Sequence, residues 1–291
     1  MLHPSASHYR PRSAITKLKF PENLTVHFRK ITSLLPQPVR FGLRKALFYG
    51  SAQTCVLCRN SVRGFRAHGG GAEVLNRRKV VGGMRRDNDR CPVCHGADRT
   101  RMMMMYLDTE TPVGDAPQSV LHVAPDFGLY LWLKRQDGVR YTGTDLDASR
   151  YRHIKGIQKA DLSATPFAAN SFDIIICSHV LEHVPDDAAA FTELFRILKP
   201  GGHALLLVPL AHDGQGTDED PSIHDPVEQE RRFGQWDHVR IYDTEGLAGR
   251  MHAAGFDTAL YDPFSADPAR AEALHLNPLE RLPIGRKSAA H

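Results

Sequence analysis

The pattern of hydrophobic and polar positions changes near residue 118. Beyond that point, short apolar runs alternate with segments whose apolar residues recur every three or four positions. Runs of the first kind predict strands and segments of the second kind predict helices. Regular alternation of the two predicts an α/β fold, with a mainly parallel sheet covered by helices on both faces. The predicted strands are 120–124, 140–146, 157–162, 172–178, 203–210, 256–261 and 280–287, and the predicted helices are 128–136, 186–198 and 244–254.

The part of the chain before residue 118 has a weaker pattern. Residues 1–50 mix Pro, Ser and basic residues, and residues 51–108 hold two C-x-x-C pairs followed by a helical segment. We therefore expect a basic arm at 1–50, a four-cysteine module with its helix at 51–108, and the α/β domain at 118–291. Within that domain, the polar stretch 211–240 is too long for a routine connection and is predicted to be an insertion. Helices are also predicted at 39–49 and 98–108.

The composition is that of an ordinary globular protein. Hydrophobic residues make up 42% of the 291 residues and charged residues 24%, which argues against a disordered chain. No window approaches eighteen uninterrupted apolar residues, so no membrane span is expected. The basic N-terminal residues lack the apolar core of a secretory signal. We therefore expect a cytoplasmic protein.

The charge is distributed unevenly along the chain. Residues 1–101 contain 20 Lys and Arg against 5 Asp and Glu, whereas residues 102–291 contain 17 against 28. A basic arm can approach nucleic acid, an anionic membrane surface or a phosphorylated substrate. It can equally be a solvated tail, because charge alone carries no specificity. RNA is therefore a possible partner of the basic N-terminal region, and both interpretations stay open.

Four of the five cysteines form two C-x-x-C pairs, Cys55 with Cys58 and Cys91 with Cys94. Two such turns can present four thiolates to one ion in a tetrahedral, zinc-ribbon-like site. Without an export signal, metal binding is favoured over disulfides. Zinc is the expected ion. Iron is an alternative, because the pairs also resemble rubredoxin-like knuckles. A second alternative is four reduced thiols with no ion between them. Four thiolates leave no open position, so the site is expected to be structural.

The loops that follow the first four strands of the α/β domain are the expected place for a ligand. In open parallel sheets, ligands bind beyond the carboxyl ends of the strands, near the point where the strand order reverses. The first of these loops ends at Gly128, and Asp145 ends the second strand 17 residues later. That spacing is close to the one at which an acidic residue meets the hydroxyls of a ribose.

Five short segments in this region resemble one known family. In chain order they are Asp161-Leu162, Pro166-Phe167, Ser171-Phe172-Asp173, His179-Val-Leu-Glu-His183 and Leu198-Lys-Pro-Gly-Gly202. Their order and spacing resemble a class I S-adenosylmethionine-dependent methyltransferase of the type 11-like kind, over about residues 118–261. The resemblance implies a Rossmann-like, seven-stranded sheet whose last strand is antiparallel. It also implies S-adenosylmethionine as the cofactor.

The resemblance implies roles for residues that follow the second and third strands. Asp145 is expected to accept hydrogen bonds from the adenosine ribose, with Leu146 beside it in the cofactor site. Asp161 is expected to accept from the adenine amino group, with Leu162 against the ring. Each aspartate has a plainer alternative, which is to cap a turn.

Ser178 and His179 at the end of the fourth strand are expected to line the cavity near the methionine portion and the methyl group. The alternative is that both residues merely end the strand. His183, four residues after His179, is expected to be a structural histidine that anchors the entry to the next helix.

The first loop departs from the family pattern. Members usually carry an acidic residue and three glycines at alternate positions, which here are His122, Ala124, Asp126 and Gly128. The methyl donor has no phosphate, so Ala124 can be tolerated beside the cofactor. We expect Asp126 to pair with the ammonium group of the methionine portion, whose carboxylate would meet N–H groups of the following helix. The alternative is that Asp126 only caps that helix.

Methyl transfer requires alignment of the acceptor and exclusion of water, and a base only where the nucleophile must lose a proton. His179 and His238 are the candidate bases. The segment around His238 is expected to form an acceptor-binding lid in which Arg240 grips a carboxylate or phosphate. The alternative is a surface loop held by a contact between Asp237 and Arg240. The expected substrate-binding residues are Trp236, Asp237, His238 and Arg240.

Three functions remain compatible with these residues. The first is a methyltransferase that acts on a small-molecule or sugar acceptor. The second is an RNA methyltransferase, because zinc-bearing ribosomal RNA guanine methyltransferases have a similar order of cysteine module and class I domain. The third is a binding protein that keeps the fold without catalysis, suggested by the altered first loop.

Overall fold

The computed structural model describes residues 35–151 and 153–289. The chain divides into two units, Met1–Arg40 and Phe41–His291. Of the first unit, the structure describes residues 35–40, which contain the beginning of helix α2 (Gln37–Phe48). Most of the predicted basic arm therefore lies outside the described residues. The elements considered below belong to the second unit.

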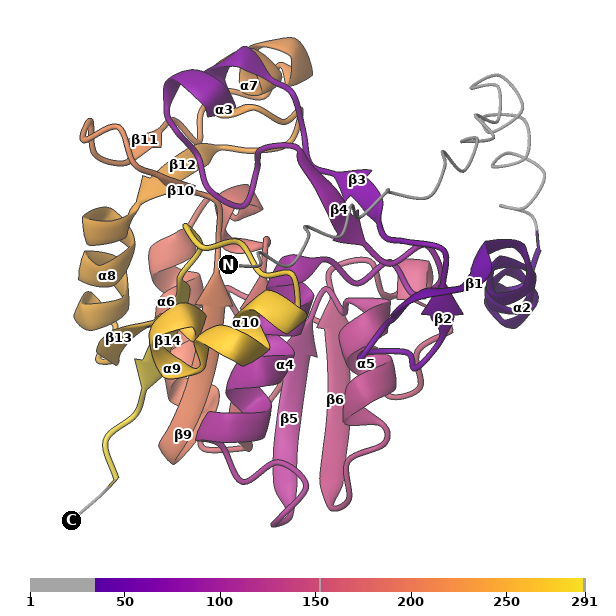
Figure 1. The fold of residues 1–291 in the computed structure, drawn as a ribbon. Coiled ribbons are helices and arrows are strands. Elements are labelled where there is room, and N and C mark those ends of the chain that lie inside the picture. The colour runs from indigo at the N-terminus through magenta and orange to yellow at the C-terminus, as the bar shows by residue number, and fades with distance from the viewer. Residues whose placement is uncertain (1–34, 152, 290–291) are drawn as a thin grey trace, which may run out of the picture. The chain divides into compact units, whose positions relative to one another are not determined.

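A seven-stranded sheet forms the centre of the second unit (Figure 1). Its strand order is β13-β14-β9-β8-β5-β6-β7. Strand β14 runs antiparallel to both of its neighbours, whereas the other pairings are parallel. The predicted fold class is confirmed, including the antiparallel last strand. The strands are β5 (Gln118–Val123), β6 (Val139–Asp145), β7 (Ile157–Lys159), β8 (Phe172–Ser178), β9 (Leu198–Leu207), β13 (Asp257–Tyr261) and β14 (Leu282–Arg286).

Strand β8 illustrates why both faces of the sheet are covered. Successive side chains of a strand point to opposite faces. Ile174 and Ile176 accordingly pack into one hydrophobic core, while Ile175 and Cys177 pack into the other. All four side chains are buried. An uninterrupted apolar run is therefore what this central strand requires.

Helices cover the two faces of the sheet (Figure 1). Helices α4 (Asp98–Glu110), α5 (Phe127–Leu133) and α10 (Pro268–Ala273) contribute to the first core. Helices α6 (Asp187–Ile197) and α8 (Thr244–Ala253) contribute to the second. The run Met102–Met105 of α4 is buried in the first core, as adaptable packing material rather than as a ligand site.

The four-cysteine segment is built from short elements. Two antiparallel pairs, β1 with β2 and β3 with β4, flank the cysteines. Leu57 and Val93 of this segment share a hydrophobic core with Leu129 and Trp132 of α5. The predicted boundary between module and α/β domain stays a prediction. The elements are β1 (Tyr49–Thr54), β2 (Ser61–Val62), β3 (Arg66–His68), α3 (Glu73–Arg77) and β4 (Arg86–Arg90).

The insertion 211–240 folds into a small second sheet with the order β10-β12-β11. Strand β12 pairs in parallel with β10 and antiparallel with β11. Val81, which follows α3, bridges to Leu210 at the start of β10 through two backbone hydrogen bonds of 2.8 and 3.1 Å. The N-terminal segment and the insertion are thus joined. The elements are β10 (Leu210–Ala211), β11 (Asp218–Glu219), α7 (Pro226–Phe233) and β12 (Arg240–Asp243).

Two predicted strands differ by three residues or more from the strands of the structure. The third was expected to reach residue 162 but ends at Lys159, because Asp161 begins a turn. The fifth was expected to begin at residue 203, whereas β9 begins at Leu198 and continues through an irregular register beside β8. Short helices η1 (Ala148–Tyr151), η2 (Leu181–His183) and α9 (Pro263–Ala266) complete the described elements. Within the described residues, no helix combines the length and apolarity needed to pass through a bilayer.

Candidate functional site

The loops that follow strands β5, β6, β7 and β8 meet at one edge of the sheet. The N–H of Ala124 donates to the carbonyl of Thr144 at 2.8 Å, and the N–H of Ala160 donates to the carbonyl of Asp145 at 3.2 Å. On the other side of β5, the N–H of His179 donates to the carbonyl of Leu207 at 2.8 Å. The structure therefore brings the residues predicted from these loops to a single edge.

The first loop is held by its own side chains. Asp126 Oδ1 accepts the N–H of Leu129 at 3.1 Å and so caps α5. Burial raises the pKa of Asp126, and the hydrogen bond from Leu129 and the charge of Arg99 oppose that rise. Ala124 has a φ of 45°, in the left-handed region that favours glycine. The backbone therefore adopts a conformation that favours glycine at a position occupied by alanine.

His122 replaces the acidic residue of the family pattern with a neutral ring. Burial lowers the pKa of His122 to about 3, so the imidazole is uncharged at neutral pH. Its Nε2 accepts the N–H of Asp126 at 3.3 Å, and its Nδ1 lies 3.3 Å from the hydroxyl of Tyr141. His122 thus anchors the loop through the N–H of Asp126 and presents no charge to a ligand.

Asp145, Leu146 and Asp161 lie together at this edge. Asp145 Oδ1 accepts the N–H of Asp147 at 2.7 Å, and Asp161 Oδ1 accepts the N–H of Ser163 at 2.8 Å. Both aspartates therefore cap turns, and each of these bonds uses one carboxylate oxygen. Leu146 is 65% exposed. An exposed leucine between two accessible carboxylates suits a ligand with an apolar face and polar edges.

Leu162 is placed differently from its exposed neighbour. Its side chain is buried in the second core, together with residues of β8 and α6. It can support the floor of the site but presents little surface to a ligand.

Gly128 faces the four-cysteine segment. A Cβ atom at this position would lie 3.1 Å from Leu57 Cδ1 and 3.2 Å from Cys94 Sγ. It would also lie 3.0 Å from Asp126 Oδ1. The glycine therefore permits the close approach of α5 to the cysteines, and the first loop rests directly on them.

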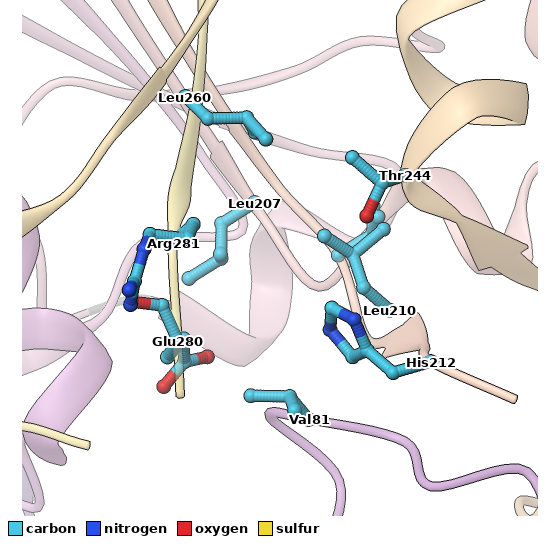
Figure 2. A pocket seen from close by; sticks show the side chains of 9 residues that line it. Val81, Leu207, Leu210, His212, Thr244, Leu260, Glu280 and Arg281 are labelled. Atoms are coloured by element: carbon cyan, nitrogen blue, oxygen red, sulfur yellow. The ribbon is translucent and has the colours of Figure 1, made fainter. Parts of the chain in front are cut away.

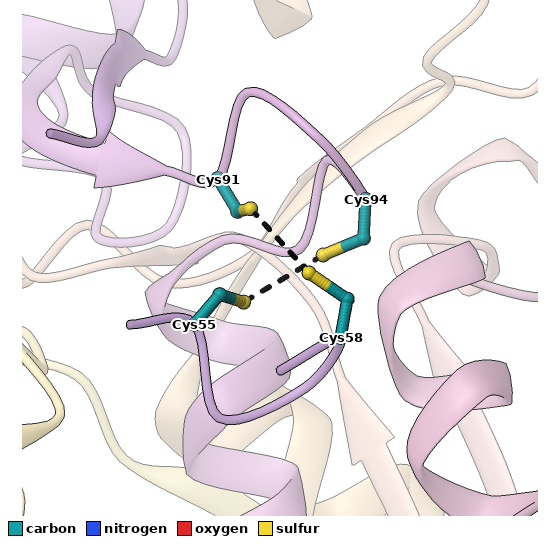
Figure 3. A group of neighbouring side chains, drawn as sticks. All are labelled: Cys55, Cys58, Cys91 and Cys94. Atoms are coloured by element: carbon teal, nitrogen blue, oxygen red, sulfur yellow. Dashed lines mark hydrogen bonds between the residues drawn. The ribbon is translucent and has the colours of Figure 1, made fainter. Parts of the chain in front are cut away.

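The four cysteines converge from two turns (Figure 3). The sulfurs of Cys55 and Cys94 are 3.7 Å apart, those of Cys58 and Cys91 are 3.9 Å apart, and all four lie within 4.8 Å of one another. A tetrahedral ion with metal–sulfur bonds of about 2.3 Å requires sulfurs about 3.8 Å apart. The cysteines are not joined in disulfides. The geometry therefore fits a four-thiolate metal site.

The two cysteine turns share one backbone arrangement. Cys55 N–H donates to the carbonyl of Asn60 at 3.0 Å, and Cys91 N–H donates to the carbonyl of Gly96 at 3.0 Å. The residues after the turns, Arg59 and His95, both have positive φ, at 57° and 66°. The equivalence of the two turns gives the pairs of sulfurs an approximate local symmetry.

His179 ends β8 beside a buried carboxyl group. Its Nδ1 lies 3.3 Å from Glu182 Oε1, in a contact not aligned as a hydrogen bond. Burial lowers the pKa of His179 to about 4, so its ring is neutral at pH 7. Ser178 precedes it and is half-buried. The Nε2 of His179 and both carboxylate oxygens of Glu182 are buried without hydrogen-bond partners.

His238 lies against His183, so the structure brings this second candidate base close to the end of β8. The ring centroids are 4.6 Å apart in an edge-to-face arrangement. His183 Nδ1 lies 3.2 Å from the carbonyl oxygen of Asp237 and 3.3 Å from its carboxylate. His238 Nδ1 lies 3.3 Å from the carbonyl of Phe233. His183 therefore holds the end of the insertion to the turn after β8.

The structure corrects the role expected of Arg240. Its side chain is 1% exposed. The guanidinium donates to the carbonyls of Leu181, Val184 and Pro185, and to the carboxylate of Glu219 at 3.1 Å. Because these donors are used inside the protein, Arg240 holds the turn after β8 and is not available to grip an acceptor.

The neighbours of Arg240 in the expected lid are more exposed. Trp236 is 61% exposed. Asp237 accepts a hydrogen bond from Gln235 at 2.8 Å, in addition to its contact with His183. These two contacts, rather than a contact with Arg240, hold Asp237.

Two residues at this edge escaped the sequence analysis. Glu280 is 5% exposed, its Oε1 has no hydrogen-bond partner, and burial raises its pKa to about 7. The positive charge of Arg99, in the first turn of α4, acts on Glu280, Asp126 and His179. Neither residue belongs to a motif, and Arg99 lies in α4 before the α/β domain whereas Glu280 precedes β14. Only the folded chain brings them to the site.

The backbone around Gly82, here called the strip, passes over Glu280 and His179. A Cβ at Gly82 would lie 2.9 Å from Glu280 Oε1 and 3.7 Å from the ring of His179. The φ of Gly82 is 88°, which also favours glycine. Gly82 therefore allows the strip to approach both side chains.

A cavity of about 50 Å³ lies next to Glu280, between the end of β9 and the start of β14 (Figure 2). Ligand pockets for drug-sized molecules are typically about 300 Å³ or more, so this cavity has room for a small group only. Glu280 and Arg281 line one side of it and Leu210 and His212 the other. The remaining lining residues are Val81, Leu207, Val208, Thr244 and Leu260.

Known proteins are similar to the part of the chain that contains this site. The model of a family described as methyltransferase domain matches residues 97–267. The ubiquinone/menaquinone biosynthesis C-methyltransferase UbiE of Serratia proteamaculans (strain 568) is 36% identical over 115 residues, which cover 35% of this chain and 46% of that protein. The corresponding protein of Edwardsiella ictaluri (strain 93-146) is 33% identical over 116 residues, which cover 36% and 46%. The matched part thus spans about half the length of these relatives.

Solved structures similar to this chain have low sequence identity. The YcgJ protein from Bacillus subtilis is 18% identical with a TM-score of 0.44, over 66% of this chain and 100% of that chain. The [4+2]-cyclase SpnF is 18% identical with a TM-score of 0.45, over 67% and 83%. An S-adenosylmethionine-dependent methyltransferase from Mesorhizobium loti is 19% identical with a TM-score of 0.41, over 59% and 92%.

Proposed function

Because this chain belongs to the methyltransferase-domain family, which its residues 97–267 match, we propose that it transfers the methyl group of S-adenosylmethionine to a small-molecule acceptor. The family agrees with the class I resemblance seen in the sequence and with the strand order of the sheet. The observation that carries the proposal is the convergence of Asp145 and Asp161 at the carboxyl edge, next to β5 and β8. This edge is where a sheet of this order binds its ligand.

The adenosine of the donor is placed between the loops after β6 and β7. Asp145, whose carboxylate also interacts with Tyr151, is assigned to the ribose hydroxyls, and Asp161 is assigned to the adenine amino group. The exposed side chain of Leu146 covers the face of the base. Hydrogen bonds to charged groups contribute about 1.5–3 kcal/mol each, so the two aspartates would dominate recognition of the nucleoside.

The methionine portion is placed beside the first loop. Asp126 is assigned to the ammonium group of the methionine portion. Arg99, whose positive charge acts on Asp126, is assigned to the carboxylate of the methionine portion. Ala124 lies beside them, where its small side chain leaves room. S-adenosylmethionine, when bound, supplies an electrophilic methyl group on its sulfonium sulfur.

The acceptor is placed on the β8 and β9 side of the donor. The small-molecule class is supported by the similarity to relatives whose names describe C-methyltransferases of ubiquinone and menaquinone biosynthesis. The mostly apolar cavity near Glu280 lies on this side. The RNA alternative rests on the basic arm, most of which lies outside the described residues, and stays a prediction.

The residues around the acceptor exclude water and orient it. The strip around Gly82 covers the ring of His179 and shields it from water. The unpartnered Nε2 of His179 is positioned to accept a proton where the nucleophile must lose one. Trp236, which is exposed in the insertion, can cover the acceptor from the solvent side.

A structural zinc ion is proposed for Cys55, Cys58, Cys91 and Cys94. The sulfur separations fit the tetrahedral geometry of four thiolates, and the set contains no open position for chemistry. Since Cys94 contacts the position of Gly128, the ion would stabilise the loop that binds the methionine portion.

Calorimetric titration with S-adenosylmethionine tests the donor site. Asp145→Ala should raise the Kd at least tenfold, because the ribose loses a charged hydrogen-bond acceptor. Asp147→Ala is the matched control, since Asp147 is exposed in the same loop and is not assigned to the donor. An unchanged affinity of the Asp145→Ala protein would refute the ribose assignment.

The acceptor class is tested with radiolabelled donor and fractionated cell extract. Transfer of label to small molecules, insensitive to RNase, is the expected result. Transfer of label to RNA would contradict a small-molecule acceptor and favour the RNA alternative. A wild-type protein that binds no donor would leave only a non-catalytic binding function.

A further inference from the structure

Three side chains of the kinds that bind metal ions converge beside the end of β8. Glu182 and His183 come from η2, and His238 comes from the end of the insertion. One ligand atom of each lies within 4.8 Å of one ligand atom of the others. Neither the donor site nor the four-cysteine site uses these three side chains as ligands.

The Nδ1 atoms of the two histidines have the kind of partner that metal-binding histidines commonly have. Metal-binding histidines usually donate the N–H of the other ring nitrogen to a carbonyl or carboxylate. Here the Nδ1 atoms of His183 and His238 face the carbonyl oxygens of Asp237 and Phe233, at 3.2 and 3.3 Å. Because carbonyl oxygens only accept, each Nδ1 carries the proton and each Nε2 keeps a lone pair.

Glu182 has a buried carboxylate that contacts His179 Nδ1 at 3.3 Å but is not aligned with it as a hydrogen bond. It is 1% exposed, and neither of its oxygens has a hydrogen-bond partner in the part of the chain that the structure describes. Its backbone is nevertheless fixed, because its carbonyl accepts the N–H of Val239 at 3.0 Å. A buried and unsatisfied carboxylate is costly, and coordination of a cation is one of the arrangements that offsets this cost.

We propose that Glu182, His183 and His238 bind a divalent transition-metal ion. Two imidazoles and one carboxylate form a ligand set that leaves coordination positions open for oxygen atoms of another molecule. The set lies at the carboxyl edge next to His179, on the side assigned to the acceptor. The ion would therefore hold an acceptor through its oxygen atoms, and this role, unlike ion binding itself, rests on the proposed function.

The ligand set narrows the chemical class of the acceptor. A divalent ion with open positions favours molecules that offer two neighbouring oxygen atoms, such as a pair of hydroxyl groups. It would also fix their orientation beside the methyl donor, which is the main contribution required of the protein. Purely apolar acceptors would gain nothing from this site.

Manganese titration followed by electron paramagnetic resonance tests ion binding without donor or acceptor. The full chain is used with zinc already in its cysteine site, because thiolates disfavour Mn²⁺. The wild-type protein should bind one further equivalent of Mn²⁺. Glu182→Gln and His238→Asn should each weaken this binding at least tenfold. His252→Asn, which changes an exposed histidine on α8, should leave it unchanged.

The proposal is overturned if the zinc-loaded wild-type protein binds no further Mn²⁺, or if folded Glu182→Gln protein binds it with the wild-type affinity. Zinc content and circular dichroism establish that each variant is folded. Should a variant not fold, cobalt provides a second measurement on the wild-type protein. A further equivalent of Co²⁺ should add visible absorption without a thiolate charge-transfer band, and the presence of that band would contradict the assignment. Donor binding, measured separately, distinguishes failure of this site from failure of the proposed function.

Discussion

At the scale of single residues, Ala124 combines a special backbone conformation with a small side chain. Its φ of 45° is typical of glycine, and its N–H is tied to Thr144 across the sheet. The left-handed conformation costs a residue other than glycine about 1–3 kcal/mol, and least for a small side chain. The hydrogen bond to Thr144 therefore helps to hold Ala124 in a conformation that alone is unfavourable.

Replacement of Ala124 should depend on the branching of the new side chain. Ala124→Val should lower the free energy of unfolding by about 2 kcal/mol, because a β-branched residue is strained at positive φ. Ala124→Gly should change it by less than about 1 kcal/mol, since relief of strain is offset by the entropy of the unfolded chain. Urea unfolding measures both, and equal effects of the two substitutions would contradict this account.

Glu280 should make stability depend on pH. Burial raises its pKa to about 7 from the ordinary 4.5, with Arg99 and Arg86 opposing this rise and Asp89 adding to it. The folded state therefore binds more protons than the unfolded state between pH 4.5 and 7, and this group lowers stability as pH rises through that window.

Glu280→Gln should remove this loss. As pH rises from 5 to 8, the free energy of unfolding of the Glu280→Gln protein should increase by up to about 3 kcal/mol relative to that of the wild-type protein. Glu272→Gln, on the exposed side of α10, is the matched control. Urea unfolding at several pH values measures the difference, and parallel pH profiles for all three proteins would exclude a raised pKa at Glu280.

At the scale of elements, the pattern of the sequence predicted the long strands and helices well. The apolar run of β8 and the proline and glycine that follow α6 leave little choice of structure. The strands β10 and β11 were missed because two residues are too few for a periodic pattern. Their pairing with β12 depends on contacts between distant segments, which periodicity does not record.

The same reason explains which part of the site could be predicted. Asp145 ends β6 and Asp161 follows β7, so their position is implied by the strand order. Glu280 and Arg99 reach the edge only through the tertiary fold. The segment around Arg240 combines aromatic, acidic and basic residues, which is typical of a binding segment. Arg240 is nevertheless buried and has a structural role.

The contact between the cysteines and α5 predicts a link between metal content and donor binding. Cys91→Ser should lower the zinc content and the soluble yield, and it should weaken donor binding, because the first loop rests on Leu57 and Cys94. Cys177→Ser, in the buried strand β8, should keep the full zinc content. Metal analysis and calorimetry measure these effects, and full zinc occupancy in Cys91→Ser protein would count against the four-thiolate site.

At the scale of the second unit, the N-terminal segment and the insertion are fastened together by ion pairs as well as by backbone hydrogen bonds. Arg78 Nε lies 2.6 Å from the carboxylate of Asp213, and both side chains are 6% exposed. The N–H of His212 donates to the carbonyl of Arg78 at 3.1 Å. This junction holds the strip around Gly82 over the site, although the family match begins only at residue 97.

Loss of this junction should be costly. Arg78→Met leaves the carboxylate of Asp213 without its partner and should lower the free energy of unfolding by about 3 kcal/mol. Arg77→Met, at the exposed neighbouring position, should change it by less than about 0.5 kcal/mol. Thermal and urea unfolding compare the two proteins, and similar stabilities would show that the ion pair contributes little.

The position of β14 constrains the order in which the protein can mature on the ribosome. This strand fits between β9 and β13, so the sheet stays interrupted until residues 282–286 have been synthesised. Glu280 arrives with it, long after the cysteines have emerged. The growing chain must therefore carry an unpaired edge of β9 while residues 208–281 are synthesised, and exposed strand edges invite aggregation. A nascent chain stalled before residue 280 should consequently depend on chaperones more than the finished protein does.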